Sequence, residues 1–376
     1  MIRTSCFLLA LFLLGGCSKN LEPVNFIADD SYPDTLSEWH VLNYANGELT
    51  PNKGVVPYDL NMQLFTDHAH KFRTVWMPDG KAAEYNAEDE FNFPVGTIIS
   101  KTFYYPRLTG SKDKLRQTED YHDDFTLTGL ALDKVRLIET RLLIHQQQGW
   151  VALPYVWNAE QTEAVLEWAG DAQALSMVDD EGQQQDFIYM VPDANQCAGC
   201  HAPNHTSKAI RPIGPKARHL NKVYGHLGST RNQLLHWQEL DYLTGFDGNI
   251  DQAPKNASFK DASATTEQLA RSYLDINCGH CHNQQGAADT SGLWLARNIT
   301  DMRRLGLCKP PVAAGRGAGN GRFAIDPGHA DISILSYRMN SVDPGEMMPE
   351  LGRSTTHAKG VALINDWINS MDGDCQ

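Results

Sequence analysis

The sequence is poor in long apolar runs and in positive charge. Beyond residue 16 no apolar run is long enough to cross a bilayer, and the mean hydropathy of -0.41 argues against a membrane protein with several spanning helices. Lysine and arginine number 32 against 46 aspartates and glutamates, which gives a formal net charge of -14. Because no long basic stripe offsets that negative field, we expect no nucleic-acid partner.

The first sixteen residues differ from this composition. Arg3 supplies a positive charge, and residues 6–14 form an apolar segment of signal-peptide length, so we expect residues 1–16 to be removed. The segment ends in Leu-Gly-Gly-Cys17, which resembles the lipobox of bacterial lipoproteins. The resemblance implies that Cys17 is acylated and, because Ser18 follows, that the protein is held at the outer membrane facing the periplasm. An ordinary secretory signal ending in a chance cysteine is the alternative.

The remaining chain is long enough for two or three cores. Residues 17–45 are polar and contain proline, which predicts a tether that leads into the first folded region. Strand-forming residues dominate from 46 to 190, in runs bounded by Gly, Pro or Gln-rich turns. The strongest of these runs are 95–105, 135–144 and 150–157. We therefore expect a β-rich domain over residues 46–190, mostly antiparallel, with a hairpin turn at 146–149.

Eight cysteines must be assigned in a chain that its signal sends to an oxidising compartment. Cys6 leaves with the signal, Cys17 takes the lipid, and four more stand in two Cys-x-x-Cys pairs. This leaves Cys308 and Cys375, which we expect to form a disulfide. Two free buried thiols are the alternative, because a sequence does not show whether two Cα atoms approach within bonding range.

Each Cys-x-x-Cys pair is followed directly by a histidine. The motifs are Cys197-Ala-Gly-Cys200-His201 and Cys278-Gly-His-Cys281-His282, and they begin 81 residues apart. Two thiols at this spacing reach the two vinyl groups of one porphyrin, and the adjacent histidine then lies under the iron. The pattern therefore predicts two covalently attached haem c groups, with His201 and His282 as the proximal iron ligands.

A zinc site built from the two Cys-x-x-Cys pairs is the main alternative, because that spacing is common in zinc ribbons. The histidine after each pair weighs against zinc, which does not require one there. A thioredoxin-like redox motif is a weaker alternative, since it does not need two copies and no βαβ context surrounds them.

From about residue 262 the sequence resembles a class I cytochrome c domain. Residues 265–277 form an amphipathic helical pattern that runs into the second motif, and residues from 357 or 358 to 371 give another. Between them Met348 precedes a proline, 66 residues after His282. The resemblance implies that the two helices pack together and that Met348 supplies the sixth iron ligand, with Met347 and Met339 as fallbacks.

The first motif has no comparable methionine, since none occurs between Cys200 and Cys281. The candidates for its sixth ligand are His219 and His226, ranked first because they lie on or beside predicted helices, then His205, His236, Met190, a residue of the β-rich domain, or no ligand. Within that domain, residues 64–73 hold two such histidines, His68 and His70. Lys71 and Arg73 in the same segment are candidates to pair with haem propionates, although a solvated strand end is the default interpretation.

The whole mature chain resembles a family of bacterial di-haem c-type cytochrome lipoproteins. The likeness lies in residues 192–201, 212–221 and 150–158. The resemblance implies an α+β multidomain fold, in which an N-terminal β-sandwich-like domain (46–190) is followed by a haem-binding segment (191–261) and an α-helical class I cytochrome c-like domain (262–376). It also implies electron transfer, and it supplies no substrate.

Three functions are compatible with these features. The leading one is electron transfer in the periplasm with a redox protein that is periplasmic or membrane-bound, for which the acidic surface favours a cationic partner. The second is a di-haem peroxidase-like enzyme with an open first haem, although the motifs are closer than two complete cytochrome c folds require. The third makes the β-rich domain a binding module with attached electron-transfer haems. No residue is assigned a catalytic role.

Overall fold

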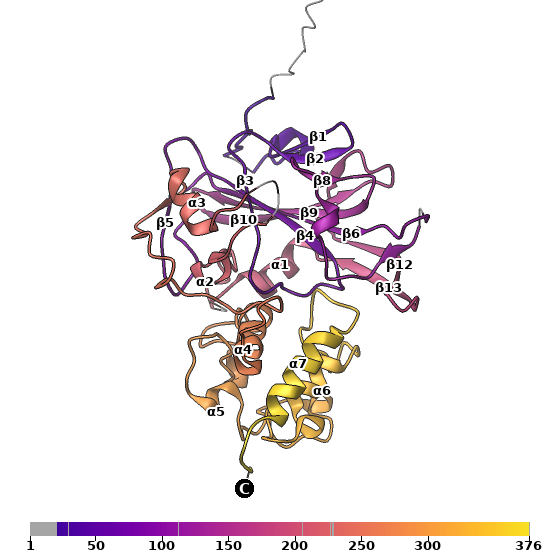
Figure 1. The fold of residues 1–376 in the computed structure, drawn as a ribbon, viewed down its shortest axis with the longest axis vertical. Coiled ribbons are helices and arrows are strands. Elements are labelled where there is room, and N and C mark those ends of the chain that lie inside the picture. Colours follow the sequence, from indigo (N-terminus) through magenta and orange to yellow (C-terminus); the bar gives the residue numbers. More distant parts are fainter. Residues whose placement is uncertain are drawn as a thin grey trace, which may run out of the picture.

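A six-stranded antiparallel sheet, here called the main sheet, forms the centre of the computed structural model, which describes residues 21–28, 30–111, 113–204, 206–225, 227 and 229–375 (Figure 1). Its strands, in spatial order, are β11 Ala164–Leu166, β10 Gly149–Trp157, β9 Val135–Gln146, β6 Ile98–Pro106, β4 His70–Trp76 and β3 Val56–Tyr58. The strands predicted from residues 95–105, 135–144 and 150–157 are confirmed as β6, β9 and β10. Gln146 pairs with Gly149, so the predicted hairpin turn is also confirmed.

Three smaller sheets surround the main sheet. They consist of β1 Leu42–Ala45, β2 Glu48–Pro51 and β8 Leu130–Ala131; of β13 Gln184–Val191, β12 Asp171–Val178 and β7 Leu115–Arg116; and of β14 Leu243–Thr244 with β5 Ala83–Glu84. The first packs over one face of the main sheet, where Leu49 and Leu130 join Phe72 and Tyr104 in one apolar cluster. That face is therefore closed to ligands by protein.

The helices are short. They are α1 Ala194–His201, α2 Ala217–Leu220, α3 Gln233–Glu239, α4 Thr266–Asn277, α5 Met302–Leu305, α6 Ile334–Asn340 and α7 Ala358–Asn369, with single 3-10 turns at Leu36–Trp39, His122–Asp124, Asp289–Ser291, Gly315–Ala318 and Ala330–Ile332. No helix in the described ranges is long and apolar enough to cross a membrane. The predicted signal peptide and Cys17 lie in residues 1–20, outside the described residues.

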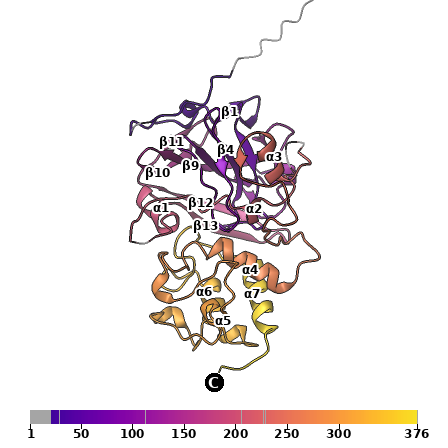
Figure 2. The same ribbon diagram turned by 90° about the vertical axis from the view of Figure 1, so that its left-hand side faces the viewer.

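The two amphipathic helices predicted near the second motif are present as α4 and α7. α4 begins with a capping box, in which the Thr265 side chain accepts from the Gln268 backbone N–H and the Gln268 side chain accepts in return. Its buried face packs against α7, and both lie at one end of the molecule, beyond α1 and α2 (Figures 1 and 2). The second motif therefore starts at a defined point, directly after α4.

One apolar cluster continues from the main sheet into these helices. It joins Val75 and Ile99 of the sheet to Leu220 of α2, and these to Leu274 of α4 and Ile364 of α7. Because the apolar faces of α4 and α7 contribute to a core that they share with the sheet, they do not enclose a separate helical core.

The predicted fold class, an α+β multidomain chain ending in an α-helical class I cytochrome c-like domain, is wrong. Over the residues that the structure describes, the fold is compact and mostly β-sheet, with four sheets and few helices. Between α4 and α7 the described residues form only short helices and 3-10 turns, so no clear class I cytochrome helical domain is present. The helical patterns at both ends of this region were located correctly, as α4 and α7. The expectation of a helical domain between them was wrong.

A buried carboxylate joins the main sheet to the C-terminal segment. Asp67, which is 1% exposed and lies just before β4, accepts hydrogen bonds from the backbone N–H groups of Ser354 (2.8 Å) and Thr355 (2.7 Å). The Thr355 hydroxyl donates a further bond of 2.8 Å. Charge-assisted bonds of this kind are strong, so the loop that carries Met348 is held against the sheet.

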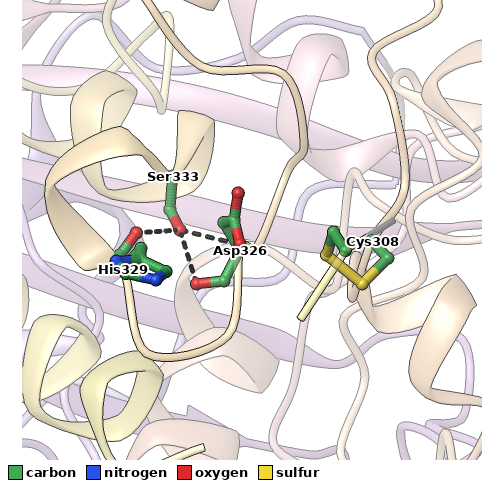
Figure 3. Close-up of a disulfide and its surroundings, with 5 residues drawn as sticks. Cys308, Asp326, His329 and Ser333 are labelled. Carbon is green, nitrogen blue, oxygen red and sulfur yellow. Dashed lines mark hydrogen bonds between the residues drawn. A yellow bond between two sulfur atoms is a disulfide. The ribbon is translucent and has the colours of Figure 1, made fainter. Parts of the chain in front are cut away.

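The two cysteines left over by the cysteine count are bonded to each other (Figure 3). Cys308 follows α5 and Cys375 follows α7, and their disulfide closes a loop of 67 residues. Beside it, the turn at residues 326–333 is held by Ser333, whose hydroxyl accepts from Asp326 N (2.9 Å) and donates to His329 O (2.8 Å). The disulfide thus fixes the end of the chain to the loop after the second motif.

Replacing Cys308 and Cys375 with serine should lower the free energy of unfolding by about 4 kcal/mol, the chain-entropy value for a loop of this length. Urea denaturation of the oxidised protein measures the loss. The single Cys308→Ser variant should lose a similar amount, because either change opens the same loop. An unchanged urea midpoint in both variants would contradict this prediction.

Candidate functional site

The first motif lies on α1, and its sequence explains why a helix begins there. The Asp193 side chain accepts from the Gln196 backbone N–H (2.8 Å), and the Gln196 side chain accepts from the Asp193 backbone N–H (3.1 Å). Cys197, Cys200 and His201 follow within that helix. One helical turn therefore presents both thiols and the histidine to the same neighbourhood.

His201 is held with one ring nitrogen free. Its Nδ1 donates to the carbonyl of Arg211 at 2.9 Å, which leaves Nε2 with the lone pair of the neutral ring. Burial, together with the positive charge of Lys101, lowers the pKa of His201 to about 4, so the ring is neutral at pH 7. A neutral imidazole oriented through its second nitrogen is the form that binds a metal ion.

A cavity of about 150 Å³ adjoins this motif, and we call it the first cavity. Cys197, Cys200 and His201 line one side of it. The open face of the main sheet and the 213–215 loop supply apolar walls, which include Ile99, Leu143, Ala152, Ile213 and Pro215. The lining of two thiols and a histidine among apolar side chains is chemically suited to a hydrophobic cofactor, although the space of about 150 Å³ is smaller than ordinary cofactor sites.

Three cations form a row on the sheet face that lines the first cavity. Arg73 of β4 pairs with Lys101 of β6, and Lys101 pairs with Arg141 of β9, so the three residues are direct neighbours across three strands. Like charges opposite each other destabilise a sheet. We call these residues the cationic row, and its place in a cavity wall indicates a site for an anionic group.

The charges of the cationic row are only partly compensated by protein. Arg141 donates to both oxygens of Glu139, whereas Arg73 is 3.8 Å from Asp59, and one guanidinium nitrogen, Nη1, makes no hydrogen bond. Among the described residues no carboxylate pairs with Lys101. Burial and the charges of Arg141 and Arg73 lower the pKa of Lys101 to about 7. Carboxylates of a bound group would supply the missing negative charge.

In the second motif, as in the first, Nδ1 of the histidine donates a hydrogen bond and leaves Nε2 free. Nδ1 of His282 is 3.2 Å from the hydroxyl of Ser291, which itself donates to the carbonyl of Ala288 (2.6 Å) and therefore accepts from the ring. Burial is the main cause that lowers the pKa of His282 to about 4. His282, like His201, is neutral with Nε2 available.

A larger cavity of about 460 Å³ adjoins the second motif, and we call it the second cavity. Cys278, Cys281 and His282 line it, together with Met339 and Met348. Met347 is buried but is not one of the residues that line this cavity. Of the three methionines singled out from the sequence, the structure therefore brings Met348 and Met339 to the second motif.

The two cavities meet at the two motifs. Six residues line both cavities, namely Phe65, Cys200, Asn277, His280, Pro349 and Leu351. The sulfurs of Cys200 and Cys281 and a ring nitrogen of His280 all lie within 4.8 Å of one another. Groups attached at Cys200 and Cys281 would therefore be in contact.

The zinc alternative requires all four thiols of the two pairs around one ion. Within the described ranges, only Cys200, His280 and Cys281 bring possible ligand atoms together, and Cys197 and Cys278 stand outside that group. A four-cysteine zinc ribbon is not the arrangement of these residues.

The structure also separates the candidates for the sixth ligand at the first motif. His205 and His226 lie outside the described residues. His70 uses both ring nitrogens, at 2.7 Å from Asp124 and 2.7 Å from the Thr118 carbonyl, and Met190 is 51% exposed on β13. His68 and His236 line neither of the two cavities. His219, which is 3% exposed, lines the first cavity.

Sequence reasoning missed three residues of this site. The sequence pointed to Lys71 and Arg73 together, but Lys71 donates to the Leu64 carbonyl. The cations that line the cavity beside Arg73 are Lys101 and Arg141. A signal was present for Lys101, which is the one charged residue in the otherwise uncharged run of β6, whereas Arg141 stands two residues after Glu139 in β9. Asp275 of α4 was also missed.

Asp275 connects the two motifs through a buried network. Its carboxylate accepts from Arg218 (2.8 and 2.9 Å), His219 (3.2 Å), Asn256 (2.9 Å) and the backbone N–H of Arg297 (3.1 Å). Burial alone would raise its pKa, but the hydrogen bonds from His219 and Arg218 and the charge of Arg218 outweigh burial and hold that pKa well below its usual range. The network fixes α2 to the helix that leads into the second motif.

No family model, no curated protein and no solved structure matches this chain.

Asp275→Asn should lower the free energy of unfolding at pH 7 by about 3–5 kcal/mol, because it leaves the buried Arg218 charge unpaired. Since the folded-state pKa of Asp275 is depressed, its stabilisation is complete above the unfolded value of about 3.9 and is lost as the pH falls further. The gap between wild type and variant in urea denaturation should therefore narrow below about pH 4.

The matched control is Asp89→Asn, which removes an exposed partner 3.9 Å from Lys216 and should cost less than about 1 kcal/mol. Equal losses in the two variants, or a gap that does not depend on pH, would count against the buried network.

Proposed function

We propose that this chain is a di-haem c-type cytochrome that carries electrons between redox partners. The observation that carries the proposal is the meeting of the two motifs, with Cys200, His280 and Cys281 placing their sulfur and nitrogen atoms within 4.8 Å of one another. A haem attached at each motif has its edge at the cysteine sulfurs. Two such edges in contact would provide a direct route for an electron between the haems.

The residues of both sites fit covalent haem. Each motif offers two thiols and a neutral histidine with Nε2 available, beside an apolar cavity. In the first cavity, the cationic row would hold the carboxylates of the haem propionates, which are the only charged groups on an otherwise apolar ring. When bound, the haem iron supplies the chemistry, the uptake and release of one electron.

We assign Met348 as the sixth ligand of the second haem. Its side chain lines the same cavity as His282, and the hydrogen bonds of Asp67 to Ser354 and Thr355 hold the loop that carries it. A thioether opposite a histidine raises the reduction potential of a haem. The second haem would therefore be the better electron acceptor of a pair in which the other haem lacks a methionine.

The position of the main sheet supports an electron carrier over a β-rich binding module. One face of the sheet is covered by β1, β2 and β8, and the other supplies Arg73, Lys101 and Arg141 to the first cavity. Both faces are thus engaged, one in packing and one in the cofactor site.

We further propose that the protein works at the periplasmic side of the outer membrane, held by a lipid on Cys17. The net charge of -14 favours a cationic redox partner, whether periplasmic or membrane-bound. Nucleic acid is not a partner in this proposal.

Removing one pair of thiols should remove one haem. The variants Cys197→Ala with Cys200→Ala, and Cys278→Ala with Cys281→Ala, should each retain one covalently bound haem per chain, measured by mass and haem absorbance. The control replaces Cys308 and Cys375 with alanine and should retain two. Two haems in either motif variant would contradict the assignment of one haem to each motif.

The electron-carrier role predicts two reversible one-electron steps in a potentiometric titration of the haem-loaded protein. Sustained consumption of hydrogen peroxide by the reduced protein would instead support the peroxidase-like alternative and contradict a carrier.

Met348→His should lower the midpoint potential of one haem by on the order of 0.1–0.2 V, a part of the roughly 0.8 V range that axial ligands cover. The Met339→Leu variant, which changes the other methionine of the second cavity, should leave both potentials in place. If Met339→Leu moves a potential and Met348→His does not, the ligand assignment is wrong.

A further inference from the structure

His219 stands out because it is deeply buried and only one of its ring nitrogens is used by the protein. It lies on α2, is 3% exposed, and lines the first cavity together with Gly214 and His201. Its Nε2 is 3.2 Å from Asp275 Oδ2, while its Nδ1 is buried and makes no hydrogen bond. A buried polar atom without a partner is costly, and in a cavity wall it points to a ligand.

The surroundings of His219 fix which nitrogen carries the proton. The Asp275 carboxylate can only accept, so Nε2 donates to it and Nδ1 of the neutral ring carries the lone pair. Arg218, Asn256 and the Arg297 backbone hold the carboxylate in place. A histidine whose second nitrogen donates to a fixed carboxylate is oriented for metal binding and is a more basic ligand.

The other nitrogen and amine groups in the first cavity are less suited to the iron. A ring nitrogen of His280 lies within 4.8 Å of both Cys200 and Cys281 sulfurs, which places it at the haem edges and not over a ring centre. Lys101 lies between Arg73 and Arg141 in the cationic row, where an anion is the complementary group. His201 belongs to the attachment motif itself.

We propose that Nδ1 of His219 is the distal axial ligand of the haem attached at Cys197 and Cys200, opposite His201. The inference rests on the proposed function only in requiring that haem. It makes the first haem six-coordinate with two histidines, so that no position on the iron is open to peroxide. A haem with two histidines has a lower potential than one with histidine and methionine. The first haem would therefore be the electron donor of the pair and the second haem the acceptor.

The test is low-temperature electron paramagnetic resonance of the full, haem-loaded chain. Wild type should show two low-spin haems. His219→Ala should keep two haems per chain by mass, convert one haem to high spin, and return it to low spin when imidazole is added. The matched control, His236→Ala on α3, should stay low-spin. Two low-spin haems in His219→Ala without imidazole would overturn the proposal.

A second variant covers the case in which His219→Ala does not fold. A Cβ built on Gly214 would lie 3.3 Å from Nδ1 of His219, so Gly214→Ala should displace the ring slightly and weaken its bond to iron. The expected result is a partial high-spin signal from one haem and cyanide binding at least tenfold faster than in wild type. Unchanged spectra and unchanged cyanide binding would contradict the assignment. Fewer than two haems in wild type would instead refute the proposed function.

Discussion

The buried carboxylate of Asp275 is the constraint on which the rest of this site depends. It lies on α4, three residues before Cys278, and its partners Arg218 and His219 are on α2, beside the first cavity. A carboxylate that is 5% exposed is stable only if its charge is fully matched, so its partners cannot separate without a large cost. The position of the second motif is thereby tied to the wall of the first cavity, and the two motifs meet.

The main sheet forms the opposite wall of the first cavity and carries the cationic row there. A row of three cations across β4, β6 and β9 is unfavourable in a sheet that stands alone. Glu139 and Asp59 offset part of that charge, and the carboxylates of a haem would offset more. The strands would therefore form the floor of the proposed first haem site.

The residues that sequence predicted well are those governed by neighbours in the chain. The strands β6, β9 and β10 depend on local runs of strand-forming residues, and α4 depends on a capping pair and a one-sided apolar pattern. The cationic row and the pairing of Asp275 with Arg218 depend on strand register and on contacts 57 residues apart, which no local pattern reveals. The fold class was wrong for the same reason, because the apolar faces of α4 and α7 gave no sign that they share a core with the sheet.

The central claim is that two haems lie edge to edge where Cys200 meets Cys281. Visible circular dichroism of the haem-loaded protein tests it most directly, since two chromophores in contact couple their transitions. The account predicts that wild type shows a split signal in the main haem absorption band that is absent from the sum of the two single-haem variants. A wild-type spectrum equal to that sum would contradict it.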